Sequence, residues 1–317
     1  MNKLRLLLVT ALALFALIGC KATEFGIDGE FTAYEASIYN NAPQVTMVTV
    51  TIEDGEIVGY YIDARQGISV QTAGDDTPED TSDDRYTFTW KEMTKKELGE
   101  DYGMDDYGGA VADWHIQAQR IEAFWLENGV DSVTVDANGK IDNVAGVTIR
   151  DESYTSLASE AVELARMGKF QTIYCTADDL YSATMTVSRT GKVSDLVFDG
   201  LQGDPSGETF AWREKTKQEL AFEYGMKDVG PGYEYTDGAW VASGEKSALE
   251  WHEQARLLAD YVMEHGYHPD LQHLGGRGGS LDGETLIEDL AGVTISSGHF
   301  YIMLANLYSL PSPDELK

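Results

Sequence analysis

The chain has 317 residues, of which 43% are hydrophobic and 24% charged, so it is long enough for two ordinary domains with packed cores. With 23 Lys and Arg against 54 Asp and Glu, its formal net charge at pH 7 is −31. This balance excludes nucleic acid and anionic lipid surfaces as partners that are held by charge, and the apolar fraction excludes a wholly disordered chain.

The first twenty residues are typical of an export signal. Lys3 and Arg5 form a basic start, 6–18 is an apolar run, and the stretch ends in Leu-Ile-Gly-Cys at Cys20. This ending is similar to the lipobox of bacterial lipoproteins, which implies a lipidated Cys20 anchored at the extracellular face of the cell membrane. An ordinary secretory signal and a single anchoring helix are the alternatives, and the apolar run is short for a spanning helix.

Cleavage before Cys20 leaves a more acidic chain with a single further thiol. Loss of Lys3 and Arg5 reduces the basic residues to 21 against 54 acidic ones, a formal charge of −33. Because Cys175 is the one other cysteine, the body must be stable on packing without an intrachain disulfide. We predict that Cys175 is a buried small hydrophobe rather than a nucleophile.

The rest of the chain repeats four segments in the same order, and the first of these reads as a hairpin. Residues 45–63 alternate apolar and polar side chains around Asp54-Gly55, and 183–199 do so around Thr190-Gly191. Each run predicts two antiparallel strands.

A capped helix comes next in each half. The segment 88–104 is similar to 210–226, and in both a Thr stands three residues before a Glu. Thr94 with Glu97, and Thr216 with Glu219, therefore predict capping boxes at helix starts.

The third segment is a longer helix that ends at Gly129 in the first half and at Gly266 in the second. Its apolar residues fall at helical spacing, and we expect them to face the core. They are Trp114, Ala118, Ile121 and Trp125 in one half, and Trp251, Ala255, Leu258 and Val262 in the other.

The last repeated segment is the string Ala-Gly-Val-Thr-Ile, at 145–149 and again at 291–295. Apolar runs at 154–167 and 300–310 follow the two strings and are typical of helices. We predict an α+β fold of two tandem domains, 21–167 and 168–317, each a small antiparallel sheet with packed helices. The boundary is placed near Gly168.

Two insertions distinguish the halves: an acidic one at 75–84 in the first, and a glycine-rich loop at 267–284 in the second. His265, His268 and His273 lie near Asp270 in and beside that loop. Their spacing fits no strong metal signature and has no counterpart in the first half, so no metal site is predicted.

The repeated string has two interpretations at the residue level. A Gly beside a Thr at a helix start lets the backbone approach a ligand, and the helix N-terminus would stabilise a phosphate there. The simpler interpretation is that Thr148 and Thr294 are N-caps, a common position for Thr.

The first string lies in Asp-Asn-Val-Ala-Gly-Val-Thr, which ends at Thr148 and is similar to the Asp-x-x-(Ser/Thr)-Gly-Ala-Thr motif of FMN-binding domains. Such domains occur in sodium-pumping quinone reductase subunits and in extracellular electron-transfer lipoproteins. The resemblance implies that two threonines carry FMN through a phosphoester, made from FAD by a magnesium-dependent flavin transferase. The cofactor-binding residues that it implies are Asp142, Gly146 and Thr148, and Glu288, Asp289, Gly292 and Thr294.

The string departs from that motif in the same way in both copies. Ala145 and Ala291 stand where the family usually has Ser or Thr, and Val147 and Val293 where it usually has Ala. The second copy also has Glu288 at the Asp position, with Asp289 after it. Shared departures indicate that the string was duplicated as a unit.

Lipobox and repeats together resemble the two-domain flavinylated lipoproteins of Gram-positive bacteria that encode a peptide pheromone. This resemblance implies a carrier that moves electrons from a membrane quinone or dehydrogenase system to extracellular acceptors such as ferric iron. It also implies a signalling fragment near 9–19. No catalytic side chain is required, because the flavin supplies the chemistry. The alternatives are a non-redox solute-binding or adhesion lipoprotein, and a protein whose active product is the signal fragment.

Four tryptophans, Trp90, Trp114, Trp212 and Trp251, either stack on the flavin rings or pack in the core. Their helical spacing favours the core. His115 and His252 follow equivalent tryptophans, and we expect them at the surface or in caps.

Overall fold

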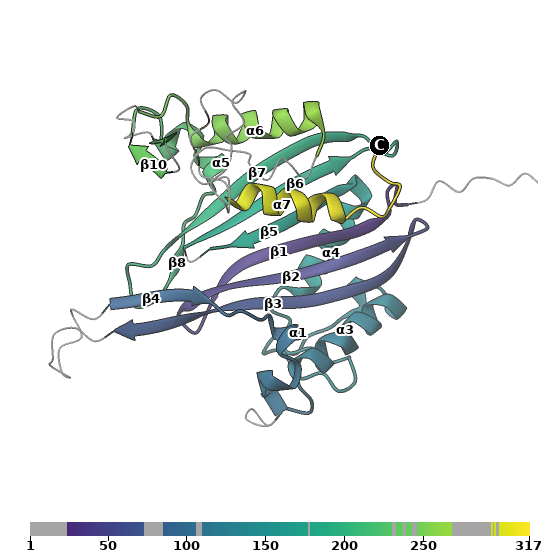
Figure 1. The fold of residues 1–317 in the computed structure, drawn as a ribbon. Helices are drawn as coiled ribbons and strands as arrows, with labels where there is room; N and C mark the ends of the chain where they lie inside the picture. The colour runs from purple at the N-terminus through teal and green to yellow at the C-terminus, as the bar shows by residue number, and fades with distance from the viewer. Residues whose placement is uncertain are drawn as a thin grey trace, which may run out of the picture.

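The fold consists of two similar sheets with helices packed on each (Figure 1). The computed structural model describes residues 24–72, 85–105, 110–176, 178–229, 233–236, 239–242, 246–267, 293, 295 and 298–317. The export signal at 1–20 and the acidic insertion at 75–84 therefore lie outside the described residues. In the described ranges, no helix is both long and apolar enough to cross a membrane.

The first sheet has four antiparallel strands in the order β1-β2-β3-β4. They are β1 (Gly29–Tyr39), β2 (Ala42–Glu53), β3 (Glu56–Thr72) and β4 (Arg85–Trp90). Asp54 and Gly55 join β2 to β3 with φ of 53° and 72°, the left-handed pair that two-residue hairpins prefer. The hairpin predicted around these residues is confirmed.

The second sheet repeats this order as β5-β6-β7-β8. Its strands are β5 (Lys169–Cys175), β6 (Asp179–Val187), β7 (Val193–Asp204) and β8 (Ala211–Trp212). Both central pairings shift register at equivalent places, between Thr51 and Ile52 and between Thr186 and Val187. A small hairpin of β9 (Tyr233–Thr236) and β10 (Ala239–Ala242) follows.

Short helices begin at the two predicted capping boxes. These are α1 (Lys95–Leu98) and α5 (Lys217–Leu220), continued by the 3₁₀ turns η1 (Gly99–Tyr102) and η3 (Ala221–Tyr224). In both, the Thr side chain accepts from the Glu N–H and the Glu side chain accepts from the Thr N–H, which confirms the capping boxes.

Longer helices cover the sheets in the same way in each half. Helix α3 (Trp114–Asn128) packs on β3 and α6 (Trp251–His265) on β7, with η2 (Val130–Ser132) after α3. Helix α4 (Tyr154–Met167) packs on β1 and β2, and α7 (Gly298–Ser309) on β5 and β6. All eight residues of the predicted apolar stripes are buried, as expected. The antiparallel sheets with helices packed on them confirm the prediction of an α+β fold.

The two sheets meet through equivalent residues. Strands β1 and β5 lie side by side (Figure 1), and Phe31 of one stacks on Phe170 of the other with ring centroids 4.2 Å apart. Phe88 meets Phe210 at 5.3 Å and Trp90 meets Trp212 at 6.5 Å. This pairing of like with like indicates an approximate two-fold relation between the sheets.

Hydrogen bonds across this contact follow the same relation. The indole N–H of Trp212 donates to the Ser37 carbonyl at 2.8 Å, and that of Trp90 donates to the Thr176 carbonyl. Trp90 and Trp212 therefore serve the contact between the sheets, a role that helical spacing did not indicate.

Cys175 ends β5 and is half-buried. Desolvation raises the pKa of its thiol to about 11, with Arg65 opposing this rise. A thiol with so high a pKa is a poor nucleophile at neutral pH, as the sequence predicted.

Candidate functional site

The first string lies in the loop between η2 and α4, where it forms an exposed turn. Gly146 has φ of 73°, a conformation that favours glycine, and both it and Ala145 are exposed. Thr148 is half-buried, while Val147 and Ile149 on either side are buried. The loop therefore presents its Gly and holds its Thr at the edge of the core.

Gln117 of α3 holds Thr148 through two hydrogen bonds. This glutamine is fully buried, and its Oε1 accepts from the Thr148 backbone N–H at 2.7 Å and from the Thr148 hydroxyl at 3.3 Å. Its Nε2 donates to the Ala112 carbonyl at 2.7 Å. The amide is thus hydrogen-bonded at both ends, and it ties Thr148 to α3 in addition to the hydrogen bonds within the loop.

Thr148 is not a helix cap, so the interpretation of this residue as an N-cap is wrong. Helix α4 begins at Tyr154 after its N-cap Ser153, and residues 150–153 separate it from the string. Ile149 turns into the core and Arg150 pairs with Lys140 in an isolated bridge, which keeps this stretch out of a helix. The prediction that the α4 N-terminus faces the Thr hydroxyl is wrong for the same reason.

A cationic side chain, rather than the N-terminus of a helix, lies against the string. Arg120 of α3 donates from Nη1 to the Gly146 carbonyl at 2.5 Å. A Cβ added at Gly146 would lie 2.5 Å from the same nitrogen, so the absence of a side chain permits this approach. Arg120 is one turn from Gln117, which brings a guanidinium close to the loop that holds Thr148.

Asp142 is exposed, and a hydrogen bond from Thr134 orients its carboxylate. The Thr134 hydroxyl donates to Asp142 Oδ1, while Asn143 accepts from the Thr134 N–H at 3.0 Å and donates to the Ser132 carbonyl at 2.7 Å. The acidic start of the motif therefore stands in solvent beside the exposed turn at Gly146.

In the second copy, Glu288, Asp289, Gly292 and Thr294 lie outside the described residues. The residue that anchors the string is nevertheless repeated. Gln254, fully buried on α6, accepts from the Ile295 N–H at 3.0 Å and donates to the Leu249 carbonyl at 3.0 Å. An equivalent glutamine thus contacts each string. Gln117 bonds the N–H of the Thr, and Gln254 bonds the N–H of the Ile that follows the Thr.

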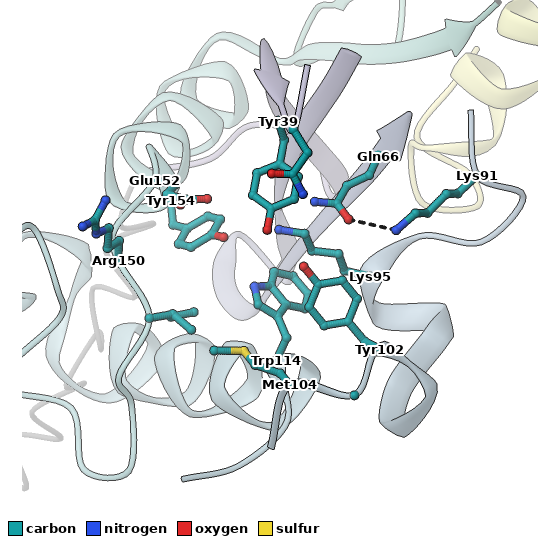
Figure 2. A pocket seen from close by; sticks show the side chains of 13 residues that line it. Tyr39, Gln66, Lys91, Lys95, Tyr102, Met104, Trp114, Arg150, Glu152 and Tyr154 are labelled. Atoms are coloured by element: carbon teal, nitrogen blue, oxygen red, sulfur yellow. Dashed lines mark hydrogen bonds between the residues drawn. The ribbon is translucent and has the colours of Figure 1, made fainter. Parts of the chain in front are cut away.

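A cavity lies beside the first string, and it was not predicted because its walls come from segments that are distant in the sequence. It has a volume of about 550 Å³ and is lined by the β1–β2 turn, α1, η1, α3 and the start of α4 (Figure 2). Lys95, the first residue of α1, is 4% exposed and reaches into it. Its Nζ lies over the rings of Tyr39, Tyr102 and Trp114, at 5.5, 5.6 and 5.3 Å from their centroids.

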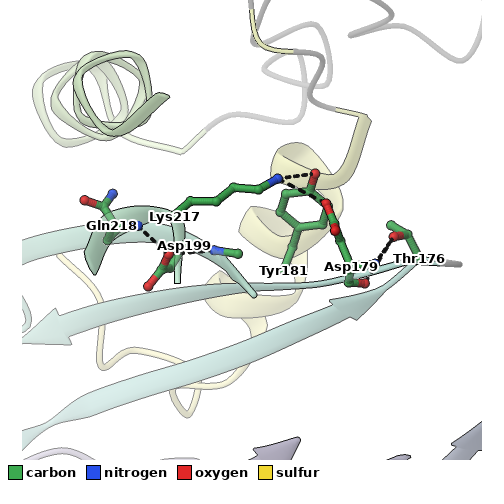
Figure 3. Close-up of polar contacts among 7 residues, drawn as sticks. Thr176, Asp179, Tyr181, Asp199, Lys217 and Gln218 are labelled. Atoms are coloured by element: carbon green, nitrogen blue, oxygen red, sulfur yellow. Dashed lines mark hydrogen bonds and ion pairs between the residues drawn. The ribbon is translucent and has the colours of Figure 1, made fainter. Parts of the chain in front are cut away.

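Lys217 is the equivalent residue of the second copy, and its ammonium group is paired (Figure 3). Its Nζ donates to Asp179 Oδ2 at 3.1 Å and to the Tyr181 hydroxyl at 2.9 Å. Burial lowers the pKa of both lysines; Asp179 opposes this for Lys217, and Glu152 opposes it for Lys95. The capping-box repeat, with a Lys directly after each Thr, was the one sequence signal for this pair.

The remaining candidates that lie among the described residues form no site. His115 and His252 are half-buried, and the Nδ1 of each is buried with no hydrogen bond to any residue that the structure describes. His265 stacks on Tyr261, whereas His268, Asp270 and His273 are outside the described residues. Within the described ranges, no three His, Cys, Asp or Glu side chains gather as a metal site would require.

Comparison with known proteins identifies no family. No family model matches the chain, and no curated protein does. Among solved structures, it is similar to a Clostridium thermocellum protein determined by solution NMR, with 24% identity over 43% of this chain and 89% of that one. The TM-score of 0.27 is too low for this likeness to support an argument.

Proposed function

We propose that this protein is an extracellular, lipid-anchored electron carrier with two FMN groups, attached covalently at Thr148 and Thr294. It takes electrons from a membrane quinone or dehydrogenase system and passes them to extracellular acceptors such as ferric iron. The flavins are added by a flavin transferase, and Cys20 carries the lipid. The signal fragment near 9–19 is a separate signalling product.

The observation that carries this proposal is the duplicated string together with its duplicated anchor. An equivalent buried glutamine bonds a backbone N–H of the string in each half, Gln117 that of Thr148 and Gln254 that of Ile295. Buried amides that are fully bonded fix a unique local geometry. Such a geometry is what a site of covalent attachment needs, because the modifying enzyme must find one hydroxyl in one position.

The first site also has the properties expected of a substrate for modification. Asp142, Ala145 and Gly146 are exposed, so a second protein has access to the loop. Arg120 lies against the Gly146 carbonyl and supplies positive charge near a phosphate joined to Thr148. These residues fit a phosphoester-linked group without assistance from a helix N-terminus.

In the proposed role the flavin accepts and releases electrons, and the protein holds it in place. Thr148 provides the covalent link, and Gln117 fixes the backbone of that residue. Covalent attachment suits an extracellular carrier, because a dissociated cofactor would be lost by dilution.

The test is the intact mass of the mature protein after co-expression with a flavin transferase. We expect two FMN-sized increments, one lost in Thr148→Val and the other in Thr294→Val. Thr190→Val, at an exposed turn outside both strings, is the matched control and keeps both increments. A colourless protein with no increment contradicts the proposal and favours a solute-binding or adhesion lipoprotein.

A further inference from the structure

The cavity around Lys95 is a second candidate site. We propose that it binds a planar aromatic anion, whose negative group pairs with Lys95 Nζ and whose ring lies against Tyr39, Tyr102 and Trp114. The cavity belongs to the first domain, and its own chemistry does not depend on a bound flavin.

The charges that line the cavity favour an anion. Lys91, Lys95 and Arg150 contribute three cations against the single carboxylate of Glu152. Among the described residues, Lys95 forms no ion pair and no hydrogen bond through Nζ, which lies over three aromatic rings. A buried ammonium without a counter-ion is unfavourable, and an anionic ligand would remove that cost. In a chain with a net charge of −31, local positive charge of this kind is unusual.

The walls favour a flat ring. Figure 2 shows the aromatic side chains of Tyr39, Tyr102, Trp114 and Tyr154 around the Lys95 ammonium group. A volume of about 550 Å³ is in the ordinary range for a small-molecule site, in which apolar and aromatic walls surround a few polar groups. Met104 adds a flexible apolar contact beside the rings.

In the second copy, two side chains of the neighbouring strand bond the equivalent lysine, Lys217. The equivalent register shifts align Ile52 with Val187, so Asp179 and Tyr181 of β6 correspond to Gln44 and Thr46 of β2. Asp179 and the Tyr181 hydroxyl bind Lys217 directly (Figure 3).

In the first copy neither group is present at these positions. Gln44 instead accepts a hydrogen bond from Gln66 Nε2 at 3.0 Å. The Nζ of Lys95 therefore faces the cavity without a bonded partner from β2. Lys217 therefore has a directly bonded counter-ion in Asp179, whereas the nearby carboxylate of Glu152 forms no ion pair with Lys95.

Two sources supply a planar aromatic anion here. Ile149 and Arg150 line the cavity directly after Thr148, so the ring of a flavin carried on Thr148 is one source, which rests on the proposed function. A free aromatic acid is the other. Both have the same chemistry at Lys95, and loading the protein with flavin distinguishes them.

The first experiment uses the full mature chain made without flavin, titrated with 1-naphthoate and with neutral 1-naphthamide by calorimetry. We expect one saturable naphthoate site that binds at least tenfold more tightly than naphthamide. No saturation by naphthoate, or equal affinity for the two probes, would overturn the proposal.

Two variants assign the charge preference. Lys95→Met should abolish the preference for naphthoate, whereas Lys217→Met, the matched change at a lysine already paired, should keep it. Tyr39→Ala alters an exposed wall residue and leaves Lys95 in place, so it should weaken both probes without unfolding the domain. Retention of the preference in Lys95→Met would exclude this lysine as the anion partner.

The second experiment repeats the titration after flavin transfer, with intact mass as an independent record of loading. Loss of naphthoate binding on loading, and its return in Thr148→Val, assigns the cavity to the tethered flavin. Unchanged binding in loaded protein assigns it to a free acid. If mass shows no flavin, the proposed function fails, while the naphthoate result still decides the cavity.

Discussion

Gln117 is the residue on which the geometry of the first string depends most. It is fully buried and satisfies the Thr148 N–H, the Thr148 hydroxyl and the Ala112 carbonyl at once. Gln117→Leu keeps the volume but leaves buried polar groups unpaired, at about 1–3 kcal/mol for each group. We therefore expect a loss of at least about 2 kcal/mol in the free energy of unfolding, measured by urea denaturation.

Thr148→Val is the matched control for Gln117→Leu, because it removes only the long hydroxyl contact and should cost under about 1 kcal/mol. Equal losses in the two variants would mean that the amide does not hold the loop.

Gly146 allows a second residue-level prediction, since its φ of 73° combines with the Arg120 contact. Gly139 has φ of 77° with nothing within 4 Å of an added Cβ, so Gly139→Ala reports backbone strain alone, about 1 kcal/mol. Gly146→Ala should cost more, because the added methyl also displaces the guanidinium from the Gly146 carbonyl. Urea midpoints give both values, and identical losses would show that Arg120 moves aside freely.

His299 makes the second domain sensitive to acid. Its ring stacks on Tyr174 and Tyr181, and burial lowers its pKa, as does Lys217, with Asp179 opposing. Because the folded pKa lies below the unfolded value of about 6.5, the unfolded state binds the proton first. The stability that this group contributes is present above pH 6.5 and is lost as the pH falls through the folded pKa.

The measurement is the free energy of unfolding of wild type and of His299→Phe between about pH 7.5 and about pH 5.5. This range extends about one unit to either side of the unperturbed pKa of histidine. Phe keeps the stacked ring and cannot titrate. We expect the wild type to lose stability relative to the variant as the pH falls. A difference that stays constant with pH would exclude His299 as the titrating group.

At the scale of elements, local sequence patterns identified the parts that local forces determine. The prediction of a helix at 154–167 matches α4, because its apolar period and the left-handed cap at Gly168 are both local. Strands β1 and β5 were not predicted, since their partners and the stacking of Phe31 on Phe170 are long-range. The Lys95 cavity was missed for the same reason. Thr148 was misplaced because a buried Ile149 ends the extended stretch before a helix can begin.

The contact between the two sheets is an element-scale feature with its own prediction. Phe31 and Phe170 are fully buried and stacked, so Phe31→Leu and Phe170→Leu should not be additive. An aromatic pair contributes about 0.5–1.5 kcal/mol beyond its buried area, and a double-mutant cycle in urea should return a coupling of that size. Phe31→Leu with Phe300→Leu, which belongs to another ring cluster, is the control and should be additive. Additivity in both cycles would mean that the sheets do not stabilise one another through this pair.

At the scale of the molecule, charge opposes the compact fold. Even if every one of the 23 basic residues paired with a carboxylate, 31 of the 54 acidic residues would remain without one. Their repulsion is released on unfolding and is screened by salt, since the Debye length falls from about 30 Å at 0.01 M to about 10 Å at 0.1 M. The thermal midpoint should therefore rise with salt over this range, and sodium chloride and choline chloride should raise it equally because screening depends on ionic strength. A rise with sodium alone would point to cation binding at particular carboxylates, and a fall would mean that surface ion pairs contribute more than the repulsion costs.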